Sequence, residues 1–349
     1  MNEEKKHILF IVNPISGTRD KTRVHYLINN NLDKEKFSWE IVKTKKVGHA
    51  IEIAAQAVRN EVDIVAAVGG DGTINEVARS LVHTHTALGI IPCGSGNGLA
   101  RHLQIPMEPR KAIKALNAGI IHKIDYGKIN DIPFFCTCGF GFDAFVSLRF
   151  ANAGKRGMLT YLEKALQEYL TYTPEMYELK VEDINIRHKA FLIACGNAAQ
   201  YGNNAYIAPQ ATITDGLLDV TILEPFTLLD VPNLAFQLFN KTLHQNNRIK
   251  TFKCKTLYVH RDKPGVIHFD GDPMVLEKDV KIEIIKESLN VIIPCEQDRD
   301  TNVLQKASDY LAELKTMNGL IMENLVESNK QRFIRNRKLI KKIMKNRNQ

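Results

Sequence analysis

Residues 64–76, IVAAVGGDGTINE, join an apolar strand-like run to a glycine turn and then to a helix-like segment. Residues 88–97, LGIIPCGSGN, repeat the order of strand and glycine turn a short distance along the chain. A glycine lets main-chain N–H groups approach an anion closely, and a helix that starts directly after the turn presents its free N–H groups to the same point. The two stretches therefore predict two phosphate-binding turns side by side.

The helix after the first turn has a start signal of its own. Thr73 and Glu76 have the spacing of a capping box, which predicts a helix over residues 74–82 with Thr73 as its N-cap. Neither glycine turn fits the Walker pattern or the dinucleotide pattern G-x-G-x-x-G. Gly-Gly-Asp-Gly is also typical of a plain tight turn, with Glu76 as a simple cap, but two such turns at equivalent positions favour phosphate binding.

Six short motifs follow one another along residues 7–295. They are Asn13-Pro14 with Ser16-Gly17, Gly69-Gly70-Asp71-Gly72-Thr73, Gly94-Ser95-Gly96-Asn97, Asp125-Tyr126-Gly127, Asp215-Gly216-Leu217-Leu218-Asp219 and Asp270-Gly271-Asp272. This ordered set resembles the diacylglycerol kinase catalytic family, which includes bacterial soluble lipid kinases and sphingosine kinases. A lone Gly-Gly-Asp-Gly-Thr is shared with NAD kinases and phosphofructokinases, whereas the whole set in this order is specific.

Strand-like and helix-like segments alternate through the first 124 residues, with strands at 7–12 and 39–44 and an amphipathic helix at 49–59. Such alternation is typical of a parallel sheet covered by helices. From residue 125 to residue 295 the segments become short, β-rich and bounded by turns, apart from a helical stretch over 157–172. We therefore expect an α/β fold of two domains with a C-terminal extension. The parts are an α/β nucleotide-binding domain with a parallel sheet at 1–124, a β-rich sandwich domain at 125–295 and a helical extension at 296–349.

The resemblance implies that ATP and Mg²⁺ bind at the glycine turns, where the strands of a parallel sheet end. The first loop would face the phosphates, with Arg19 and Lys21 either as countercharges or as ordinary surface bases. The nucleotide-binding residues implied in this way are Asn13, Ser16, Gly17, Arg19, Lys21, Gly70, Asp71, Gly72, Thr73, Glu76, Gly94, Ser95, Gly96, Asn97, Arg101, Asp125 and Asp272. The loop at 154–157, Gly-Lys-Arg-Gly, either meets phosphate or is solvated.

Two aspartates carry the predicted chemistry. By resemblance, Asp270 is the general base that takes the proton of the acceptor hydroxyl, while Asp71, with Asp125 facing the cleft, anchors Mg²⁺. Asp270-Gly271 is also typical of a hairpin turn, so that alternative stays open.

A structural Mg²⁺ is implied at Asp215, through its carboxylate, and at Leu217, through its carbonyl oxygen. The resemblance also implies an acidic ligand three residues earlier, where this chain has Thr212. Asp215 as a simple turn residue is therefore the alternative.

The acceptor is expected to be a lipid alcohol that enters between the domains, diacylglycerol first and a sphingoid base next. After Asn97 the diacylglycerol kinases carry an aspartate, whereas this chain has Gly98. Two further hypotheses remain: a soluble-metabolite kinase of the NAD kinase type, and a non-catalytic protein that binds lipid or nucleic acid.

Charge is concentrated at the end of the chain. Residues 329–349 contain nine Lys or Arg and no acid, whereas the first 328 residues have 38 Lys and Arg against 39 Asp and Glu. Apolar residues share a helical face with these bases, which suits an anionic membrane surface; a solvated tail is the alternative. No aromatic platform accompanies the bases, so we expect no nucleic-acid partner.

An amphipathic helix is expected over 301–326, either packed on the protein or paired in a homodimer. The chain has no apolar run of the ~20 residues that cross a bilayer and no secretion signal, so we expect a cytoplasmic protein, peripheral at the inner membrane face. The six cysteines are expected to be reduced.

Overall fold

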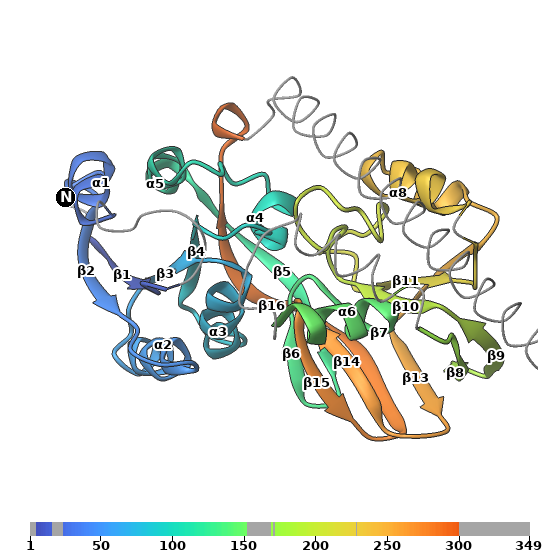
Figure 1. Ribbon diagram of the computed structural model, residues 1–349. Helices are drawn as coiled ribbons and strands as arrows, with labels where there is room; N and C mark the ends of the chain where they lie inside the picture. Colours follow the sequence, from blue (N-terminus) through green and yellow to red (C-terminus); the bar gives the residue numbers. More distant parts are fainter. Residues whose placement is uncertain (1–4, 16–23, 152–168, 170–171, 228, 300–349) are drawn as a thin grey trace, which may run out of the picture.

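The protein has two lobes that share one long sheet (Figure 1). The structure, a computed structural model, describes residues 5–15, 24–151, 169, 172–227 and 229–299. The expected helix at 301–326, the basic segment 329–349 and the loop at 154–157 lie outside these residues, as does nearly all of the helical stretch at 157–172.

The N-terminal lobe is a parallel sheet with helices on both faces, as predicted. Its strands pair in the order β2-β1-β3-β4. In Figure 1, α1 and α5 cover one face and α2 and α3 the other. The elements are β1 (Lys6–Val12), α1 (Val24–Asn31), β2 (Phe37–Lys43), α2 (His49–Arg59), β3 (Ile64–Gly69), α3 (Asp71–Leu81), β4 (Ala87–Pro92), α4 (Gly98–His102) and α5 (Pro109–Ala118).

The residues of β3 and β4 are all buried, which explains their continuous apolar runs. A parallel strand that is covered on both faces has no solvent side for polar residues. Both strands therefore end inside the molecule. The glycine turns that follow them begin next to each other there.

The C-terminal lobe is an antiparallel sandwich, also as predicted. A second sheet, of order β12-β11-β10-β7-β14-β15, packs on the far part of the first through a core contributed by both sheets. The elements are β5 (Ile120–Ile129), β6 (Ile132–Phe134), β7 (Thr137–Gly141), α6 (Phe142–Ala151), β8 (Glu175–Val181), β9 (Ile184–Ala190), β10 (Leu192–Gly196), β11 (Leu218–Leu223), α8 (Val231–Phe239), β12 (Ile249–Cys254), β13 (Thr256–Arg261), β14 (Gly265–Phe269), β15 (Asp272–Leu276) and β16 (Asp279–Ile293); 3₁₀ turns lie at Leu243–Gln245 and Glu296–Asp298.

Two strands cross from one lobe to the other. In Figure 1, β5 and β16 run side by side out of the N-terminal lobe into the sandwich, and they pair in antiparallel fashion along most of their length. The end of β16 pairs with β4 at Val291 and Leu88, and Leu289 and Val291 belong to the N-terminal core. The chain therefore returns to its first lobe after the sandwich. The expected division assigns all of residues 125–295 to the second domain and so does not describe this return.

Strand β16 continues through an irregularity near its middle. A register shift between Ile285 and Leu289 interrupts its pairing with β5, and Glu287 has a positive φ of 46° there. Such a bulge bends a strand without ending it. The elements that the sequence did not predict include α1, α5, α6, β9, β12, β15 and α8.

Candidate functional site

The two glycine turns touch, as the sequence predicts. A Cβ placed on Gly94 would lie 2.6 Å from the Cα of Gly70, and one placed on Gly70 would lie 3.2 Å from the Cα of Gly94. Real Cβ atoms do not approach backbone as closely as 2.6 Å, so this contact requires glycine at position 94, while a Cβ at position 70 would be tight. The turns follow the neighbouring strands β3 and β4, which explains why they meet.

The first turn provides the open anion site. Gly70 is the N-cap of α3, and the N–H groups of Asp71, Gly72 and Thr73 form the first turn of an 11-residue helix, where no intrahelical acceptor exists. The positive end of the helix dipole lies at the same place. This helix end can therefore bind a phosphate group.

The second turn is already hydrogen-bonded to its surroundings. Asn97 has a φ of 52°, its Oδ1 accepts the N–H of Gly94 at 3.0 Å, and its Nδ2 donates to the carbonyl of Gly94 at 2.8 Å. The N–H groups of Asn97 and Gly98 donate to Asp71 at 2.8 and 2.6 Å. In this structure the Gly94 and Asn97 N–H groups therefore shape the turn, and their binding to phosphate stays a prediction.

Asp71 holds the two turns together and has an unusual protonation equilibrium. Burial, with a smaller contribution from the charge of Asp270, raises its pKa from 3.8 to about 6 against the opposing effect of the Gly98 and Asn97 N–H donors. An aspartate with a pKa near neutrality exchanges protons readily under physiological conditions.

The predicted capping box is wrong. The helix begins at Asp71, so Thr73 and Glu76 both lie inside it. Thr73 Oγ1 accepts a hydrogen bond from Asn13 Nδ2 at 3.1 Å, which ties the first loop to the first glycine turn. Glu76 instead caps α2, because its two oxygens accept the N–H groups of Gly48 and Ala50 at 3.0 and 3.2 Å. Glu76 therefore positions a neighbouring helix.

Asp270 lies in a two-residue hairpin turn, and its predicted role as base stays a prediction. Strands β14 and β15 pair up to Phe269 and Asp272, and Asp270 and Gly271 between them have φ values of 48° and 89°. Positive φ at both central positions is the geometry that favours Asp-Gly.

The carboxylate of Asp270 accepts four hydrogen bonds. Oδ1 accepts the N–H groups of Cys136 and Thr137 at 2.7 and 3.1 Å. Oδ2 accepts the N–H of Phe135 at 2.8 Å and the Nδ2 of Asn75 at 2.7 Å. The base role predicted for Asp270 therefore requires that one of these bonds break first. As it stands, the side chain fixes residues 135–137 against α3.

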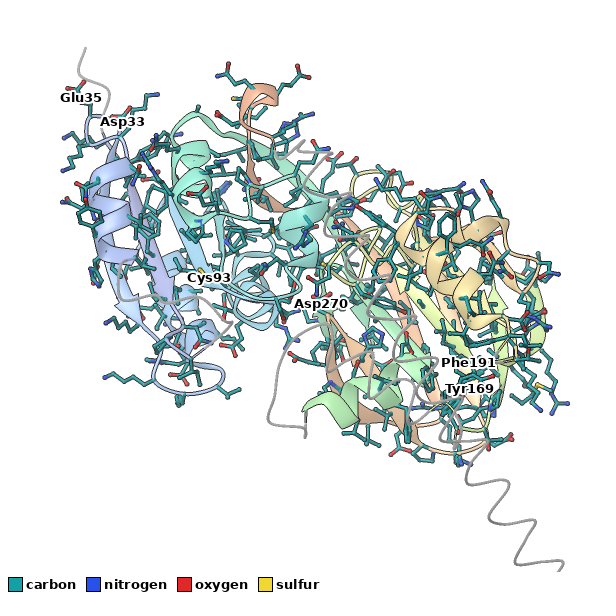
Figure 2. All side chains as sticks on the ribbon, turned by 45° about the horizontal axis from the view of Figure 1, so that its top comes forward. Asp33, Glu35, Cys93, Tyr169, Phe191 and Asp270 are labelled. Carbon is teal, nitrogen blue, oxygen red and sulfur yellow. The ribbon has the colours of Figure 1, made fainter. Side chains whose placement is uncertain are left out.

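The two lobes meet at this hairpin, and Figure 2 shows Asp270 between them. Helix α3 sends Asn75 to Asp270 and places the Arg79 guanidinium 5.0 Å from the centre of the Phe269 ring. Burial lowers the pKa of Arg79, while the charges of Asp270 and Asp272 act in the opposite direction. The sequence contained a signal for both residues, because they follow Asp71 at steps of four along one helix face.

Asp272 also reaches this junction. Its Oδ2 lies 4.0 Å from the point where a Cβ on Gly72 would be, so it faces the N-terminus of α3 from the other lobe. Asp272 therefore lies near the start of α3, whereas the Asp71 carboxylate is bound to the second turn. The predicted contacts at Ser16, Gly17, Arg19 and Lys21 fall outside the described residues.

Asp125 does not face the cleft, which corrects the prediction. Its side chain is 0% exposed. Oδ2 accepts the N–H of Gly216 at 2.7 Å and Oδ1 the N–H of Glu287 at 2.8 Å. Asp125 is therefore a structural carboxylate that fixes a loop and the bulge of β16, and it is not available to ATP or Mg²⁺.

A loop that the sequence did not single out packs on the second glycine turn. Gly202, with a φ of 118°, lies so close to Gly96 that a Cβ would be 2.9 Å from its main chain. The carbonyl of Gly96 accepts the N–H of Asn203 at 3.1 Å and the Nε of Arg101 at 2.9 Å. Arg101 therefore fixes the turn together with the C-terminal lobe.

A buried polar cluster connects that loop to the Asp270 hairpin. Asp143 Oδ2 accepts the Tyr201 hydroxyl at 2.8 Å and lies 3.0 Å from His268 Nε2. Asp143 and His268 are 3% and 2% exposed. An aromatic cluster lies beside it: Phe142, Tyr169, Tyr172, Phe191 and Phe226. Figure 2 shows two of its members, Tyr169 and Phe191, within the C-terminal lobe.

Comparison with known proteins agrees with this geometry. Residues 7–129 match the family model described as diacylglycerol kinase catalytic domain, and residues 136–293 match the YegS C-terminal NAD kinase beta sandwich-like domain. A Salmonella schwarzengrund protein named "Probable lipid kinase YegS" is 31% identical over 258 residues, which cover 72% of this chain and 85% of that protein. The chain belongs to the diacylglycerol kinase catalytic family.

Other relatives agree. A Pectobacterium atrosepticum protein named "Probable lipid kinase YegS-like" is 29% identical over 299 residues, 84% of this chain and 97% of that protein. A crystal structure described as a putative diacylglycerol kinase from Bacillus anthracis has a TM-score of 0.70 at 22% identity, over 84% of this chain and 98% of that one, and shows the same fold. Membership makes the chain a kinase, and a kinase domain uses ATP.

The structural Mg²⁺ site implied for this kinase does not fit its residues. Lys253 Nζ lies 2.9 Å from Asp215 Oδ2 and 3.1 Å from Asp219 Oδ2, so a lysine ammonium already lies where the metal would be. The other oxygen of Asp215 accepts the N–H of Leu217. The resemblance implies that this carboxylate and the Leu217 carbonyl oxygen would bind one metal ion. No group of three or more His, Cys, Asp or Glu with metal-binding geometry occurs in the described part of the chain.

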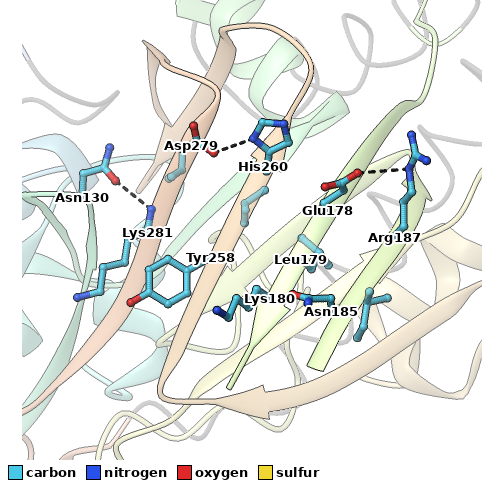
Figure 3. Close-up of a pocket in the computed structure, with 13 residues that line it drawn as sticks. Asn130, Glu178, Leu179, Lys180, Asn185, Arg187, Tyr258, His260, Asp279 and Lys281 are labelled. Atoms are coloured by element: carbon cyan, nitrogen blue, oxygen red, sulfur yellow. Dashed lines mark hydrogen bonds and ion pairs between the residues drawn. The ribbon is translucent and has the colours of Figure 1, made fainter. Parts of the chain in front are cut away.

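A concave surface of about 480 Å³ lies elsewhere, on the outer face of the sandwich (Figure 3). Strands β8, β9, β13 and β16 line it, with side chains such as Glu178, Lys180, Tyr258 and Lys281. Its acids and bases pair with one another, as in Arg187 with Glu178 and His260 with Asp279. It contains no residue of either glycine turn, so it is not part of the candidate active site of the kinase.

Within the described ranges, no helix has both the length and the apolar character needed to span a bilayer.

Proposed function

We propose that this kinase transfers the γ-phosphoryl group of ATP to the hydroxyl of a lipid, with diacylglycerol as the leading acceptor. The observation that carries the proposal is that Asp71 and Asp270, one from each lobe, are close enough to interact electrostatically beside an open helix N-terminus. Phosphoryl transfer needs a phosphate cradle and an acceptor held in line with it. The relatives named as lipid kinases support a lipid as that acceptor.

The phosphates of ATP would bind at the N-terminus of α3, where three N–H groups and the helix dipole favour negative charge. Mg²⁺ bound with ATP would neutralise part of that charge. Asp272, whose Oδ2 lies near Gly72 at the start of α3, is the carboxylate placed to hold it.

The proton of the acceptor hydroxyl must pass to a base. Asp71 suits this role better than Asp270, because burial brings its pKa to about 6 and each of its oxygens accepts a single N–H from the second turn. Asp270 is engaged by four donors and would hold the acceptor side of the junction in place.

The lipid would enter between the lobes. The polar cluster of Asp143, Tyr201 and His268 lies near the hairpin, and the aromatic cluster around Phe191 lies next to it. A glycerol backbone beside the polar cluster would direct its acyl chains to the aromatic side chains. A sphingoid base fits the same arrangement, and so remains the next acceptor to test.

The decisive experiment offers purified protein ATP, Mg²⁺ and a panel of acceptors: diacylglycerol, monoacylglycerol, sphingosine, ceramide and NAD. Labelled phosphate should appear in the diacylglycerol product. NAD is included because the model that matches residues 136–293 is described as NAD kinase beta sandwich-like. Transfer to NAD alone, or to no alcohol, would refute the lipid proposal.

We also propose that the basic segment 329–349 brings the enzyme to anionic membrane surfaces. The proposal rests on its nine bases and on the apolar residues that share a helical face with them. Near such a surface each base contributes ~1 kcal/mol. Sedimentation with vesicles of phosphatidylglycerol and phosphatidylcholine, for the full chain and for a chain that ends at residue 328, tests it. Equal binding by both forms would remove the role.

A further inference from the structure

The loop at 212–217 connects the cores of the two lobes. Ile213 packs in the N-terminal core, whereas Leu218 packs in the core of the sandwich. The N–H of Asp125 donates to the Ile213 carbonyl at 2.8 Å, and the N–H of Gly216 donates to the Asp125 carboxylate at 2.7 Å. The conformation of this short loop therefore helps to set how the lobes sit on each other.

Two carboxylates at this loop converge on one point. Asp215 and Asp219 are 28% and 11% exposed at their side chains, and one oxygen of each lies within 3.1 Å of Lys253 Nζ. The carbonyl of Gln210 lies 3.4 Å from the same nitrogen. Like charges this close together repel each other strongly unless a cation lies between them. The ammonium supplies that cation.

The sheet itself determines the position of the lysine. In the pairing of β11 with β12, Lys253 is the direct partner of Asp219. Cross-strand partners have neighbouring side chains, so the ammonium comes from a fixed strand. Two other lysines on or next to β12, Lys250 and Lys255, are exposed and form no ion pair among the described residues.

We propose that the Lys253 ammonium is the resident cation of the Asp215–Asp219 loop in this protein, in place of a divalent metal. Mg²⁺ requires near-octahedral oxygen ligands, and it would have to displace a positive charge already held by both acids. Thr212, where an acid would complete a metal site, is exposed and uses its carbonyl to accept the N–H of Asp215. The junction of this kinase is therefore independent of structural metal.

The test measures thermal unfolding of the full chain without nucleotide, in EDTA and in 10 mM Mg²⁺ or Ca²⁺. The unmodified protein should melt at the same temperature in all three buffers. Lys253→Met should melt about 3 to 6 °C lower in EDTA, because two carboxylates then lack a counterion. Mg²⁺ or Ca²⁺ should return part of the loss, and more of it in the double variant Lys253→Met with Thr212→Asp.

Lys250→Met is the matched control, on the same strand but outside the ion pair, and should melt like the unmodified protein in every buffer. Metal-dependent melting of the unmodified protein would overturn the proposal. So would a Lys253→Met variant that melts normally in EDTA, or one whose loss neither ion reverses even with Thr212→Asp. These outcomes leave the lipid-kinase proposal untouched, since no step of phosphoryl transfer enters the measurement.

Discussion

The Asp-Gly turns of the two lobes place similar carboxylates in opposite circumstances. Asp71 is held where burial opposes its charge, and its pKa rises to about 6. Asp270 has its charge stabilised by four hydrogen-bond donors, three of them main-chain N–H groups. A carboxylate that destabilises the fold is retained for chemistry, whereas one that is fully satisfied holds structure. The comparison assigns reaction to the first turn and geometry to the second.

Asp71→Asn should have the largest effect on activity. Loss of the base should lower kcat by about 10²- to 10⁴-fold, which is what general-base catalysis contributes. Radiolabelled transfer to lipid vesicles measures this. Activity within tenfold of the unmodified enzyme would show that the reacting carboxylate lies elsewhere.

The same variant should not lose stability. A carboxyl whose pKa is raised stabilises the fold below its ordinary pKa, and that contribution is lost as pH rises through about 6. At neutral pH the buried charge costs about 3 kcal/mol, at ~1.4 kcal/mol per tenfold change in acidity. Asp71→Asn removes that cost but loses one acceptor, so urea unfolding at pH 7 should give an equal or higher free energy, and a smaller difference at pH 4.

Asp270→Asn should show the opposite pattern. An amide can accept at its oxygen but not at its nitrogen, so two N–H groups of the set around Asp270 lose their acceptor. We expect a loss of about 2–4 kcal/mol in the free energy of unfolding, since an unsatisfied buried donor costs ~1–3 kcal/mol. A variant that unfolds normally but transfers no phosphate would restore Asp270 as the base and reverse the comparison.

The sequence predicted the glycine turns because their signals are local. Gly70 and Gly94 each follow an apolar run, and neighbouring parallel strands bring their ends together. The parallel sheet and the antiparallel sandwich were predicted for the same reason, from alternation and spacing. The return of β16 into the first lobe has no such signal, because one pair of residues, Val291 and Leu88, joins segments about 200 positions apart.

Partners of single polar residues were the least predictable feature. Glu76 has the spacing to cap its own helix, yet it caps α2, which only the packing of α2 on α3 could show. The resemblance implies that Asp125 faces the cleft, but its carboxylate is buried and accepts the N–H groups of Gly216 and Glu287. Gly202 lies about 100 residues from the turn on which it packs, and no local pattern connects them.

The acid limb of the pH profile tests the coupling between the two turns. If Asp71 must be ionised, kcat/KM should fall tenfold per pH unit below about 6. The charge of Asp270 raises the pKa of Asp71, so Asp270→Asn should move this limb to lower pH while its slope stays the same. A limb that vanishes in Asp270→Asn would identify Asp270 as the titrating group.

Glu76→Gln should have the smallest effect and defines the edge of the reactive region. Gln keeps one oxygen acceptor, so only one of the two N–H groups at the start of α2 loses its partner. Loss of such a cap costs about 1 kcal/mol, and the negative charge near the helix N-terminus adds ~0.5 kcal/mol. Because both oxygens of Glu76 bind α2 and not the open end of α3, KM for ATP should stay within about twofold. A tenfold rise in that KM, with stability unchanged, would mean that Glu76 contacts the nucleotide. The nucleotide site would then reach one helical turn further along α3 than the hydrogen bonds of Glu76 indicate.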